Sequence, residues 1–245
     1  MKERVRECFN KGAESYDSAA IVQAKVAKYL SKRIPKIIPH TILEIGCGTG
    51  LFSQEILAFF PKASILLIDI APVMVETCKM RFKDFLNVET ISMDGELLKD
   101  LDFSFDLIIS SMSLHWFTEI SASFNKIISK LSSGGQFVFA MLGNNSLPEW
   151  REICNQHNFP NPMPSLPQVQ RLKQDFPHIE FEIETLTQSY NSIYDFLTTL
   201  KKIGAVATHE NYAKSSSGAL RQLVRRFDEE IIISYEIIYG VYKKL

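Results

Sequence analysis

The sequence predicts an α/β fold built on a doubly wound, seven-stranded, mostly parallel sheet. Short apolar runs alternate with helical segments over residues 41–142, as parallel strands joined by crossover helices require. The runs are almost wholly apolar, which is typical of strands that are buried on both faces. The glycine-rich stretch GCGTG follows the first run, at the end of the sheet where open α/β folds bind ligands.

Each element of this fold has its own signal. Residues 3–34 have apolar positions at helical spacing, and Pro35 and Pro39 close that segment. Right-handed crossovers would place the later helices on both faces of the sheet. The first five strands are expected at 41–46, 64–70, 88–94, 105–114 and 136–142. Helices are expected between them at 51–60, 71–85 and 120–131, the last ending at Gly134-Gly135.

The character of the sequence changes after Gly143. The proline-rich segment 143–179 predicts a helix over 147–156, a loop and a second short helix, which would form a cap beside the sheet. Two further strands, expected at 181–191 and 231–245, would form an antiparallel edge. Helices are expected between them at 192–204 and 217–230. We interpret residues 1–245 as one domain with four parts: N-terminal helices (1–40), a ligand-binding core (41–142), the cap (143–179) and the C-terminal strands and helices (180–245).

Composition excludes several classes of protein. The net charge of −1 gives no basic field for nucleic acid. No secretory leader and no apolar run of membrane-spanning length is present, so we expect a cytoplasmic protein, acting as a monomer and without a membrane partner. The cysteines Cys8, Cys47, Cys78 and Cys154 have no metal-binding spacing, so we expect free thiols and no metal site.

The glycine loop has a specific spacing, Glu44-x-Gly46-x-Gly48-x-Gly50. Without Cβ atoms such a loop turns tightly and lets a ligand approach the backbone. A dinucleotide fingerprint, GxGxxG, would need its third glycine at position 51, where Leu51 stands. The spacing therefore argues against a nicotinamide dehydrogenase.

This ExGxGxG pattern resembles motif I of the class I S-adenosylmethionine-dependent methyltransferases. The resemblance implies S-adenosylmethionine as cofactor, with Asp69 on the ribose hydroxyls, Asp94-Gly95 at the adenine amino group, and Glu44 anchoring the loop or the methionine ammonium. Ser111-Met112 and SLHWF would form the wall around the methionine and methyl groups. The complete set of expected cofactor-binding residues is Glu44, Gly46, Cys47, Gly48, Gly50, Asp69, Ile70, Met74, Asp94, Gly95 and Ser111.

Outside the core, the sequence resembles the malonyl-acyl-carrier-protein O-methyltransferases of biotin synthesis over nearly its whole length. The similar segments are CFNKGAESYDSAAIVQAKVA, SSMSLHWF, NNSLPEW, LKKIGAVATHE and SYEIIYGVYKK. Two positions depart from that family: Asn211-Tyr212 replaces a frequent Gly-Arg, and His115 replaces a Gln. In this family the leading segment folds over the cofactor, so residues 1–40 are expected to form a lid.

The resemblance implies methyl transfer to the free carboxylate of a malonyl thioester, carried by acyl-carrier protein or coenzyme A. The product would be the methyl ester that primes pimeloyl synthesis. We expect Tyr16, His115 and Trp116 at the reacting groups, and Lys201 and His209 as substrate-binding residues. Helix 218–230, with Arg221, Arg225 and Arg226, would be a docking surface for the carrier protein or simply a solvated face.

Two other interpretations stay open at the level of sequence. One is a methyltransferase that acts on trans-aconitate, a quinone or another small acid. The other is a cofactor-binding assembly factor, or a hydroxylase-like relative, in which methyl transfer has been lost.

Overall fold

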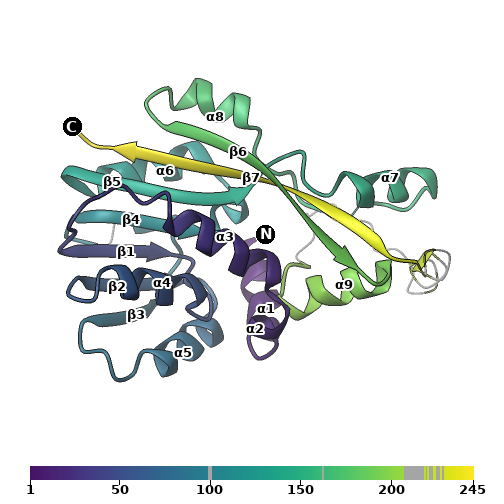
Figure 1. Cartoon of the computed structure of the whole chain (residues 1–245), viewed down its shortest axis with the longest axis horizontal. Helices are drawn as coiled ribbons and strands as arrows, with labels where there is room; N and C mark the ends of the chain where they lie inside the picture. Colours follow the sequence, from purple (N-terminus) through teal and green to yellow (C-terminus); the bar gives the residue numbers. More distant parts are fainter. Residues whose placement is uncertain are drawn as a thin grey trace.

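Seven strands form one sheet in the order β3-β2-β1-β4-β5-β7-β6 in the described part of the chain (Figure 1). The strands are β1 (Thr41–Ile45), β2 (Ser64–Asp69), β3 (Val88–Ser92), β4 (Phe105–Ser111), β5 (Leu131–Leu142), β6 (Glu180–Tyr190) and β7 (Ile231–Lys243). This computed structural model describes residues 1–98, 101–161, 163–206, 218, 220, 223–224, 227 and 229–245.

The sheet is parallel from β3 to β5 and antiparallel at β7, which pairs with both β5 and β6. Strand order reverses between β1 and β4, where crossover connections run in opposite directions from the centre of the sheet. The carboxyl ends of β1 and β4 are therefore the place where an open α/β sheet binds its ligand. The expected fold class is confirmed, including the antiparallel pairing of the last two strands.

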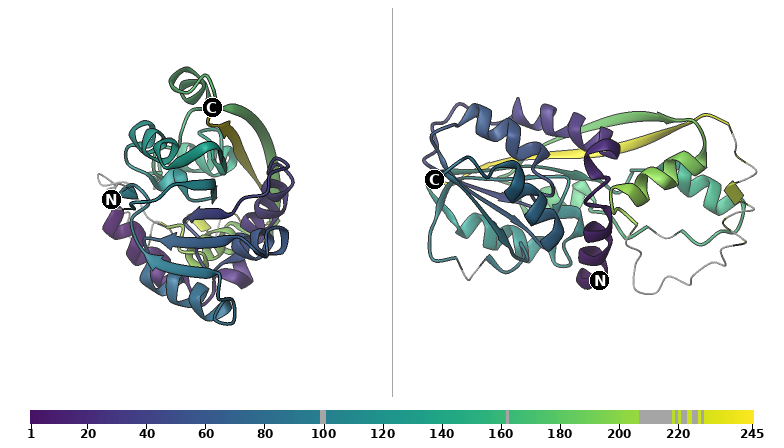
Figure 2. Two further views of the ribbon diagram at one scale, coloured as in Figure 1. Left: turned by 90° about the vertical axis from the view of Figure 1, so that its left-hand side faces the viewer. Right: turned by 90° about the horizontal axis from the view of Figure 1, so that it is seen from below.

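Helices cover both faces of this sheet (Figure 2). The helices among the described residues are α1 (Lys2–Gly12), α2 (Tyr16–Ala19), α3 (Ile21–Ser31), α4 (Leu51–Phe59), α5 (Pro72–Arg81), α6 (Ile120–Ser129), α7 (Pro148–Gln156), α8 (Val169–Asp175) and α9 (Ile193–Lys202), with a short 3₁₀ helix η2 (Leu114–Trp116). Helices α3, α4, α7 and α9 contribute to one apolar core, while α6 and α8 contribute to the other. The segment 143–179 thus sends α7 to one face and α8 to the other.

The strand expected at 105–114 ends at Ser111 and the helix expected at 71–85 ends at Arg81, and larger differences from the expected elements occur in two places. The helical segment expected at 3–34 is divided into α1, α2 and α3, because the backbone leaves the helical region at Ala20 (φ −81°, ψ 46°). Strand β5 begins at Leu131, five residues before the expected 136, and Gly134-Gly135 lie inside it. Gly134 has a φ of +75°, and the pairing of β5 with β4 shifts register nearby. Its left-handed backbone therefore belongs to an irregularity within the strand and not to the end of a helix.

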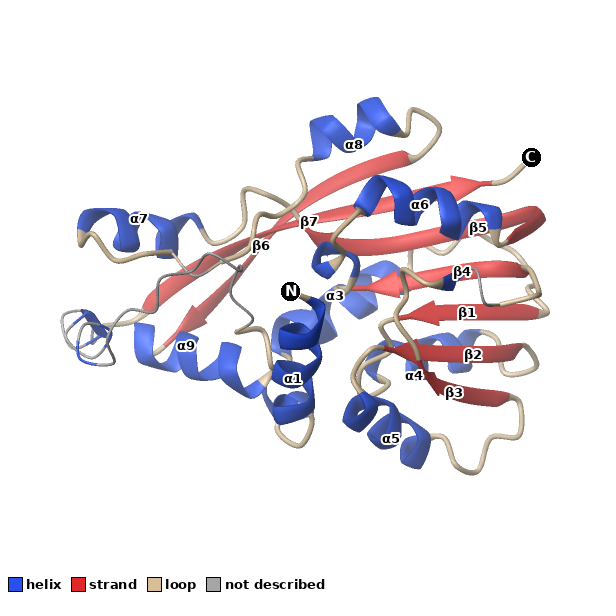
Figure 3. Ribbon diagram, turned by 180° about the vertical axis from the view of Figure 1, so that it is seen from behind, coloured by secondary structure: helices blue, strands red, loops and turns tan. Residues whose placement is uncertain are grey.

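The long strands β6 and β7 extend past the end of β5, beyond the parallel part of the sheet (Figure 3). Leu142, the last residue of β5, pairs with Ile237, so the first residues of β7 lie beyond it. Helices α7 and α9 lie beside this extension. The helix expected at 217–230 falls mostly outside the described residues.

Candidate functional site

The loop between β1 and α4 forms one wall of the candidate site. The N–H groups of Gly46 and Cys47 both donate to the Ile68 carbonyl, at 2.8 and 3.0 Å, and tie the loop to β2. A Cβ atom at Gly46 would lie 2.0 Å from Oγ of Ser113, in the loop that follows β4. The missing side chain at position 46 therefore lets the loops after two neighbouring strands meet.

Gly48 contributes to the same loop in a different way. Its φ is +54°, and a Cβ atom there would meet nothing within 4 Å. Its backbone lines a small cavity at the end of the sheet, so a ligand can contact the main chain at this point. Gly50 ends the loop at the start of α4, where a Cβ atom would lie 2.6 Å from the Phe82 ring.

Asp69, the last residue of β2, holds the loop in place. Its Oδ2 accepts a hydrogen bond from the N–H of Gly48 at 3.0 Å, and its Oδ1 accepts one from Ala71 at 2.8 Å. Burial raises the pKa of this carboxyl, while the backbone N–H donors oppose that shift. Asp69 also lines the small cavity, which is the position expected for a residue that binds ribose hydroxyls.

Glu44 and Cys47 lie behind the loop and do not line the small cavity. Glu44 is 1% exposed, and its Oε2 accepts a hydrogen bond from Ser53 on α4 at 2.6 Å. Burial raises its pKa to about 8. Contact with Cys78, together with burial, raises the pKa of the Cys47 thiol, so Cys47 is a protonated packing residue.

The small cavity, of about 70 Å³, contains most of the expected cofactor-binding residues. Those that line it are Gly46, Gly48, Asp69, Ile70, Met74, Asp94, Gly95 and Ser111. All of them except Met74, which lies on α5, follow or end β1, β2, β3 or β4, so the strand order brings them to one edge of the sheet.

The N-terminal helix α1 closes this cavity with a charged residue that the sequence did not single out. The Nζ of Lys2 lies 2.6 Å from Oδ2 of Asp94 and also pairs with Glu96. Further along the N-terminal segment, Asp17 accepts from Thr49 of the glycine loop at 2.5 Å and pairs with Arg81. Residues 1–19 are thus fastened at both ends to the half of the molecule that carries the glycine loop.

A second, much larger cavity of about 810 Å³ adjoins the first, with walls that are mostly apolar. Four residues line both cavities: Phe9, Tyr16, Met112 and Trp116. Phe9 of α1 and Trp116 of η2 make an edge-to-face contact, with ring centroids 5.6 Å apart. Tyr16 and Trp116 therefore stand where a group held in one cavity would meet a group held in the other.

The two polar side chains expected beside the reacting groups are both uncharged. Burial lowers the pKa of His115 to about 3, and the ring is 6% exposed, so it is neutral at physiological pH. Burial, with the nearby charges of Asp69 and Asp17, raises the pKa of Tyr16, so its hydroxyl keeps the proton. The boundary between the cavities is therefore a neutral surface with hydrogen-bond donors.

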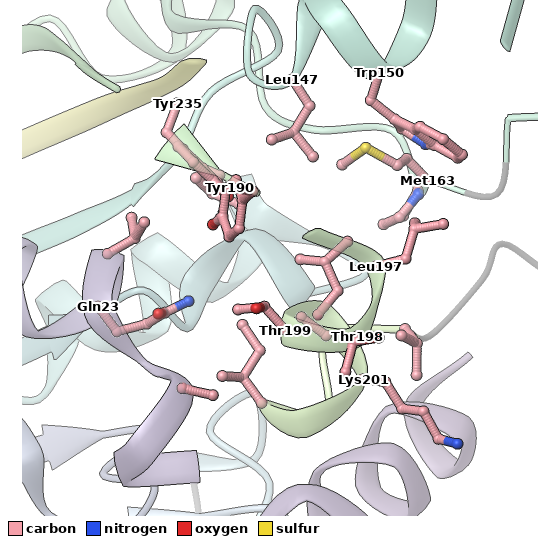
Figure 4. Close-up of a pocket in the computed structure, with 18 of the residues that line it drawn as sticks. Gln23, Leu147, Trp150, Met163, Tyr190, Leu197, Thr198, Thr199, Lys201 and Tyr235 are labelled. Carbon is pink, nitrogen blue, oxygen red and sulfur yellow. The ribbon is translucent and has the colours of Figure 1, made fainter. Parts of the chain in front are cut away.

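The residues expected to bind the rest of the substrate have different positions. Lys201 lines the large cavity, but Figure 4 shows its ammonium pointing away from the interior. His209 lies outside the described residues, as do Arg221, Arg225, Arg226 and the segment 207–217. Sequence reasoning missed Gln23, Tyr190 and Tyr235, which line the large cavity. Gln23 and Tyr235 lay in segments noted for their resemblance but were given no role there, while Tyr190 occurs in an ordinary strand pattern.

The strand order, the glycine loop after β1 and Asp69 at the end of β2 define a class I S-adenosylmethionine-dependent methyltransferase, and a methyltransferase-domain family model matches residues 42–135. A malonyl-[acyl-carrier protein] O-methyltransferase of Magnetococcus marinus is 30% identical, covering 95% of this chain and 89% of the relative. One from Ilyobacter polytropus is 31% identical, covering 100% and 95%. The chain belongs to the malonyl-[acyl-carrier protein] O-methyltransferase family, as the sequence indicated.

Solved structures confirm the fold at low sequence identity. The YcgJ protein of Bacillus subtilis matches with a TM-score of 0.63 and 17% identity, over 90% of this chain and 98% of that one. The N-methyltransferase NodS of Bradyrhizobium japonicum, solved with S-adenosyl-L-homocysteine, matches with a TM-score of 0.53 and 14% identity, over 91% and 86%.

The residues at the end of the sheet fit S-adenosylmethionine. Gly48 leaves open space beside the backbone, and the carboxylates of Asp69 and Asp94 offer acceptors for hydroxyl and amino groups. Sites for ligands of this size are about 300–1,000 Å³, larger than the small cavity alone. The adjoining large cavity, or movement of Lys2 away from Asp94 and Glu96, would supply the remaining space.

The described residues contain no group of three or more His, Cys, Asp or Glu side chains placed to hold a metal ion. None of their helices has the length and apolar character that crossing a membrane requires.

Proposed function

We propose that this protein transfers a methyl group from S-adenosylmethionine to the free carboxylate of a malonyl thioester, with malonyl-acyl-carrier protein as the natural substrate. The observation that carries the proposal is the shared boundary of the two cavities at Tyr16 and Trp116. It lets an acceptor in the large cavity reach a methyl group held above the glycine loop. The names of the relatives support the choice of acceptor.

When bound, S-adenosylmethionine supplies the methyl group and a positively charged sulfur, and its carbon–sulfur bond breaks as a carboxylate oxygen takes the methyl. A malonyl carboxylate is ionised at neutral pH, so no general base is needed. The neutral ring of His115 and the protonated Tyr16 suit this reaction, since they can orient the carboxylate by hydrogen bonds without neutralising it. Trp116 and Phe9 exclude water from the reacting atoms.

We assign the remaining roles on the same basis. Gly46, Gly48, Ile70, Met74, Gly95 and Ser111 shape the cofactor cavity, Asp69 binds the ribose and Asp94 the adenine. Glu44, Cys47 and Gly50 support the loop from behind. Residues 1–40 act as a lid, and 143–179 cap the acceptor half. We propose Lys201, at the exposed end of α9, and His209 as residues that meet the carrier arm. We further propose a cytoplasmic monomer that needs neither a membrane nor nucleic acid.

The apolar walls of the large cavity also suit a quinone or another apolar acid as acceptor. Methylation of a ring carbon needs a base to activate it, and His115, with a pKa of about 3, is a poor one. This observation favours carboxyl methylation over ring methylation.

A direct assay tests the proposal. Purified protein is incubated with S-adenosylmethionine and malonyl-acyl-carrier protein, malonyl-coenzyme A, trans-aconitate or a quinone, and methylated products are measured. We expect methyl ester on malonyl-acyl-carrier protein, lost with Asp69→Ala and reduced about tenfold with Tyr16→Phe. Tyr242→Phe, outside both cavities, is the matched control. Cofactor binding without product on any malonyl thioester would contradict the proposal and favour an assembly factor.

A second test uses a biotin-requiring strain that lacks its malonyl-acyl-carrier-protein methyltransferase. We expect the wild-type gene to restore growth without biotin and Asp69→Ala to fail. Absence of growth with a well-expressed wild type would redirect the search to other acceptors.

A further inference from the structure

One end of the large cavity gathers polar side chains, although most of its wall is apolar. Figure 4 shows Gln23, Tyr190, Tyr235 and Thr199 directed towards the same part of the cavity. They come from α3, the end of β6, β7 and α9. Four labelled apolar residues, Leu147, Trp150, Met163 and Leu197, lie around the opposite part of the cavity.

The two tyrosine hydroxyls have two O–H donors between them but make only one hydrogen bond to protein among the described residues. Their hydroxyl oxygens lie 2.7 Å apart, and the residues are 7% and 5% exposed. Each hydroxyl has one proton, so their mutual hydrogen bond uses one proton and leaves the other O–H group to find an acceptor. Within the described residues neither hydroxyl makes a second hydrogen bond. Burial raises the pKa of both Tyr190 and Tyr235, so both protons stay in place at neutral pH.

The neighbouring side chains of Gln23 and Thr199 also lack hydrogen-bond partners among the described residues. Within the part of the chain that the structure describes, neither the side-chain amide of Gln23 nor the hydroxyl of Thr199 makes a hydrogen bond to protein. An uncharged donor inside an apolar cavity is costly unless a ligand or water satisfies it. None of these four groups has a charge, so together they can bind a neutral oxygen acceptor such as a carbonyl.

We propose that Tyr190 and Tyr235, assisted by Gln23, form a subsite for the thioester carbonyl oxygen of the substrate. The inference rests on the proposed function. With the carboxylate held at Tyr16 and His115, the carbonyl that follows it lies further into the same cavity. The free tyrosine O–H donates to this oxygen. These residues are positioning residues: they orient the acyl group and distinguish a malonyl thioester from a carboxylic acid that lacks the carbonyl.

The test compares two substrates that differ only at this carbonyl. Malonyl-pantetheine has it, while S-(2-carboxyethyl)pantetheine has a CH2 group in its place and keeps the carboxylate. We expect Tyr190→Phe/Tyr235→Phe to lower kcat/KM for malonyl-pantetheine about 3- to 10-fold, as loss of a neutral hydrogen bond predicts, and to affect the thioether much less. Where the wild type binds the thioether without methylating it, the inhibition constant replaces kcat/KM.

Controls separate recognition from folding. Tyr29→Phe removes a tyrosine hydroxyl from α3, outside both cavities. It should leave kcat/KM unchanged for both substrates. Gln23→Met, on a different element from the tyrosines, should shift the ratio between the two substrates in the same direction as the double variant. The KM for S-adenosylmethionine should stay constant throughout. If the double variant fails to fold, the single variants Tyr190→Phe and Tyr235→Phe are measured in the same way.

An equal fall for both substrates would show a merely structural role and overturn the inference, while leaving the proposed function intact. If the wild type methylates none of malonyl-pantetheine, the thioether and malonyl-acyl-carrier protein, the proposed function is overturned and the inference with it. A changed ratio, with unchanged cofactor KM, supports the subsite.

Discussion

The ammonium of Lys2 lies 2.6 Å from the Asp94 carboxylate, and this contact joins the first turn of α1 to the loop after β3. Lys2 also pairs with Glu96, whose Oε1 accepts hydrogen bonds from the N–H groups of Thr118 and Glu119. The carboxylate of Asp94 is thus occupied by a residue of the same chain at the point where the adenine amino group is expected. If Asp94 binds the adenine as we propose, cofactor binding and the position of α1 are coupled through the Lys2 side chain.

Replacing Lys2 should therefore strengthen cofactor binding. In Lys2→Ala the Asp94 carboxylate is free, so we expect S-adenosylmethionine to bind about 2- to 5-fold more tightly, within the range of a partly exposed ion pair. Titration calorimetry at low and at 0.5 M salt measures this, and the advantage should shrink as salt screens the wild-type pair. Lys11→Ala, on the exposed side of α1, is the control. Unchanged or weaker binding in Lys2→Ala would contradict the coupling.

Three glycine-to-alanine substitutions, at Gly134, Gly46 and Gly48, should report different effects. These are backbone strain alone, strain with steric overlap, and strain with loss of the space that the ligand occupies. Gly134 and Gly46 share a φ of +75°, but only at Gly46 does a Cβ atom meet a neighbour, at 2.0 Å from Ser113 Oγ. We expect Gly134→Ala to lower the free energy of unfolding by about 1–2 kcal/mol and Gly46→Ala to lower it further. Gly48→Ala should resemble Gly134→Ala in stability and yet lose cofactor affinity. Denaturant unfolding and calorimetry measure the two effects, and equal cofactor binding in Gly48→Ala and Gly134→Ala would argue against the assigned site.

Glu44 should destabilise the protein as the pH rises. Burial raises its pKa to about 8, above the ordinary 4.5, so its contribution is full below pH 4.5 and is lost between pH 4.5 and 8. The loss is at most about 1.4 kcal/mol per pH unit. Glu44→Gln lacks this titration, so its stability relative to wild type should increase from pH 5 to pH 8 in urea unfolding. Glu76→Gln, exposed on α5, is the matched control. A difference that stays flat with pH would show that Glu44 is ionised in the folded protein.

His115 should have the opposite pH dependence. Its folded-state pKa, about 3, lies below the ordinary 6.5, so its contribution is full above pH 6.5 and is lost as the pH falls towards 3. We expect thermal unfolding of the wild type to shift down more steeply between pH 6.5 and 4.5 than that of His115→Gln. Activity between pH 6 and 8 should show no step from His115, since the ring is neutral throughout. Parallel stability profiles for the two proteins would contradict a buried neutral ring.

The sequence signals for the expected cofactor-binding residues are local, so it could be predicted that these residues lie at one edge of the sheet. Gly46, Gly48 and Asp69 each stand next to a buried strand, and parallel pairing of β1 with β2 is enough to bring them together. The acceptor half depends on contacts that no local pattern reports. Tyr190 and Tyr235 meet although 45 residues separate them. The contact between Lys2 and Asp94 at the small cavity spans 92 residues and was missed for the same reason.

One local signal was misleading for a physical reason. Paired glycines after a helix are typical of a helix end, and this predicted a boundary at Gly134-Gly135. The helix instead ends at Ser129, and the positive φ of Gly134 serves the irregular pairing of β5 with β4. A left-handed glycine is compatible with both structures, so the residue type alone could not decide between them.

The division of the sheet has an evolutionary consequence. The glycine loop and Asp69 belong to β1 and β2, whereas Tyr190 and Tyr235 belong to β6 and β7, which continue past the end of β5. With the roles proposed above, substitutions on this extension would change which acceptor binds and leave the residues around the methyl donor as they are. Divergence into new acceptor specificities would therefore require change at only one end of the molecule.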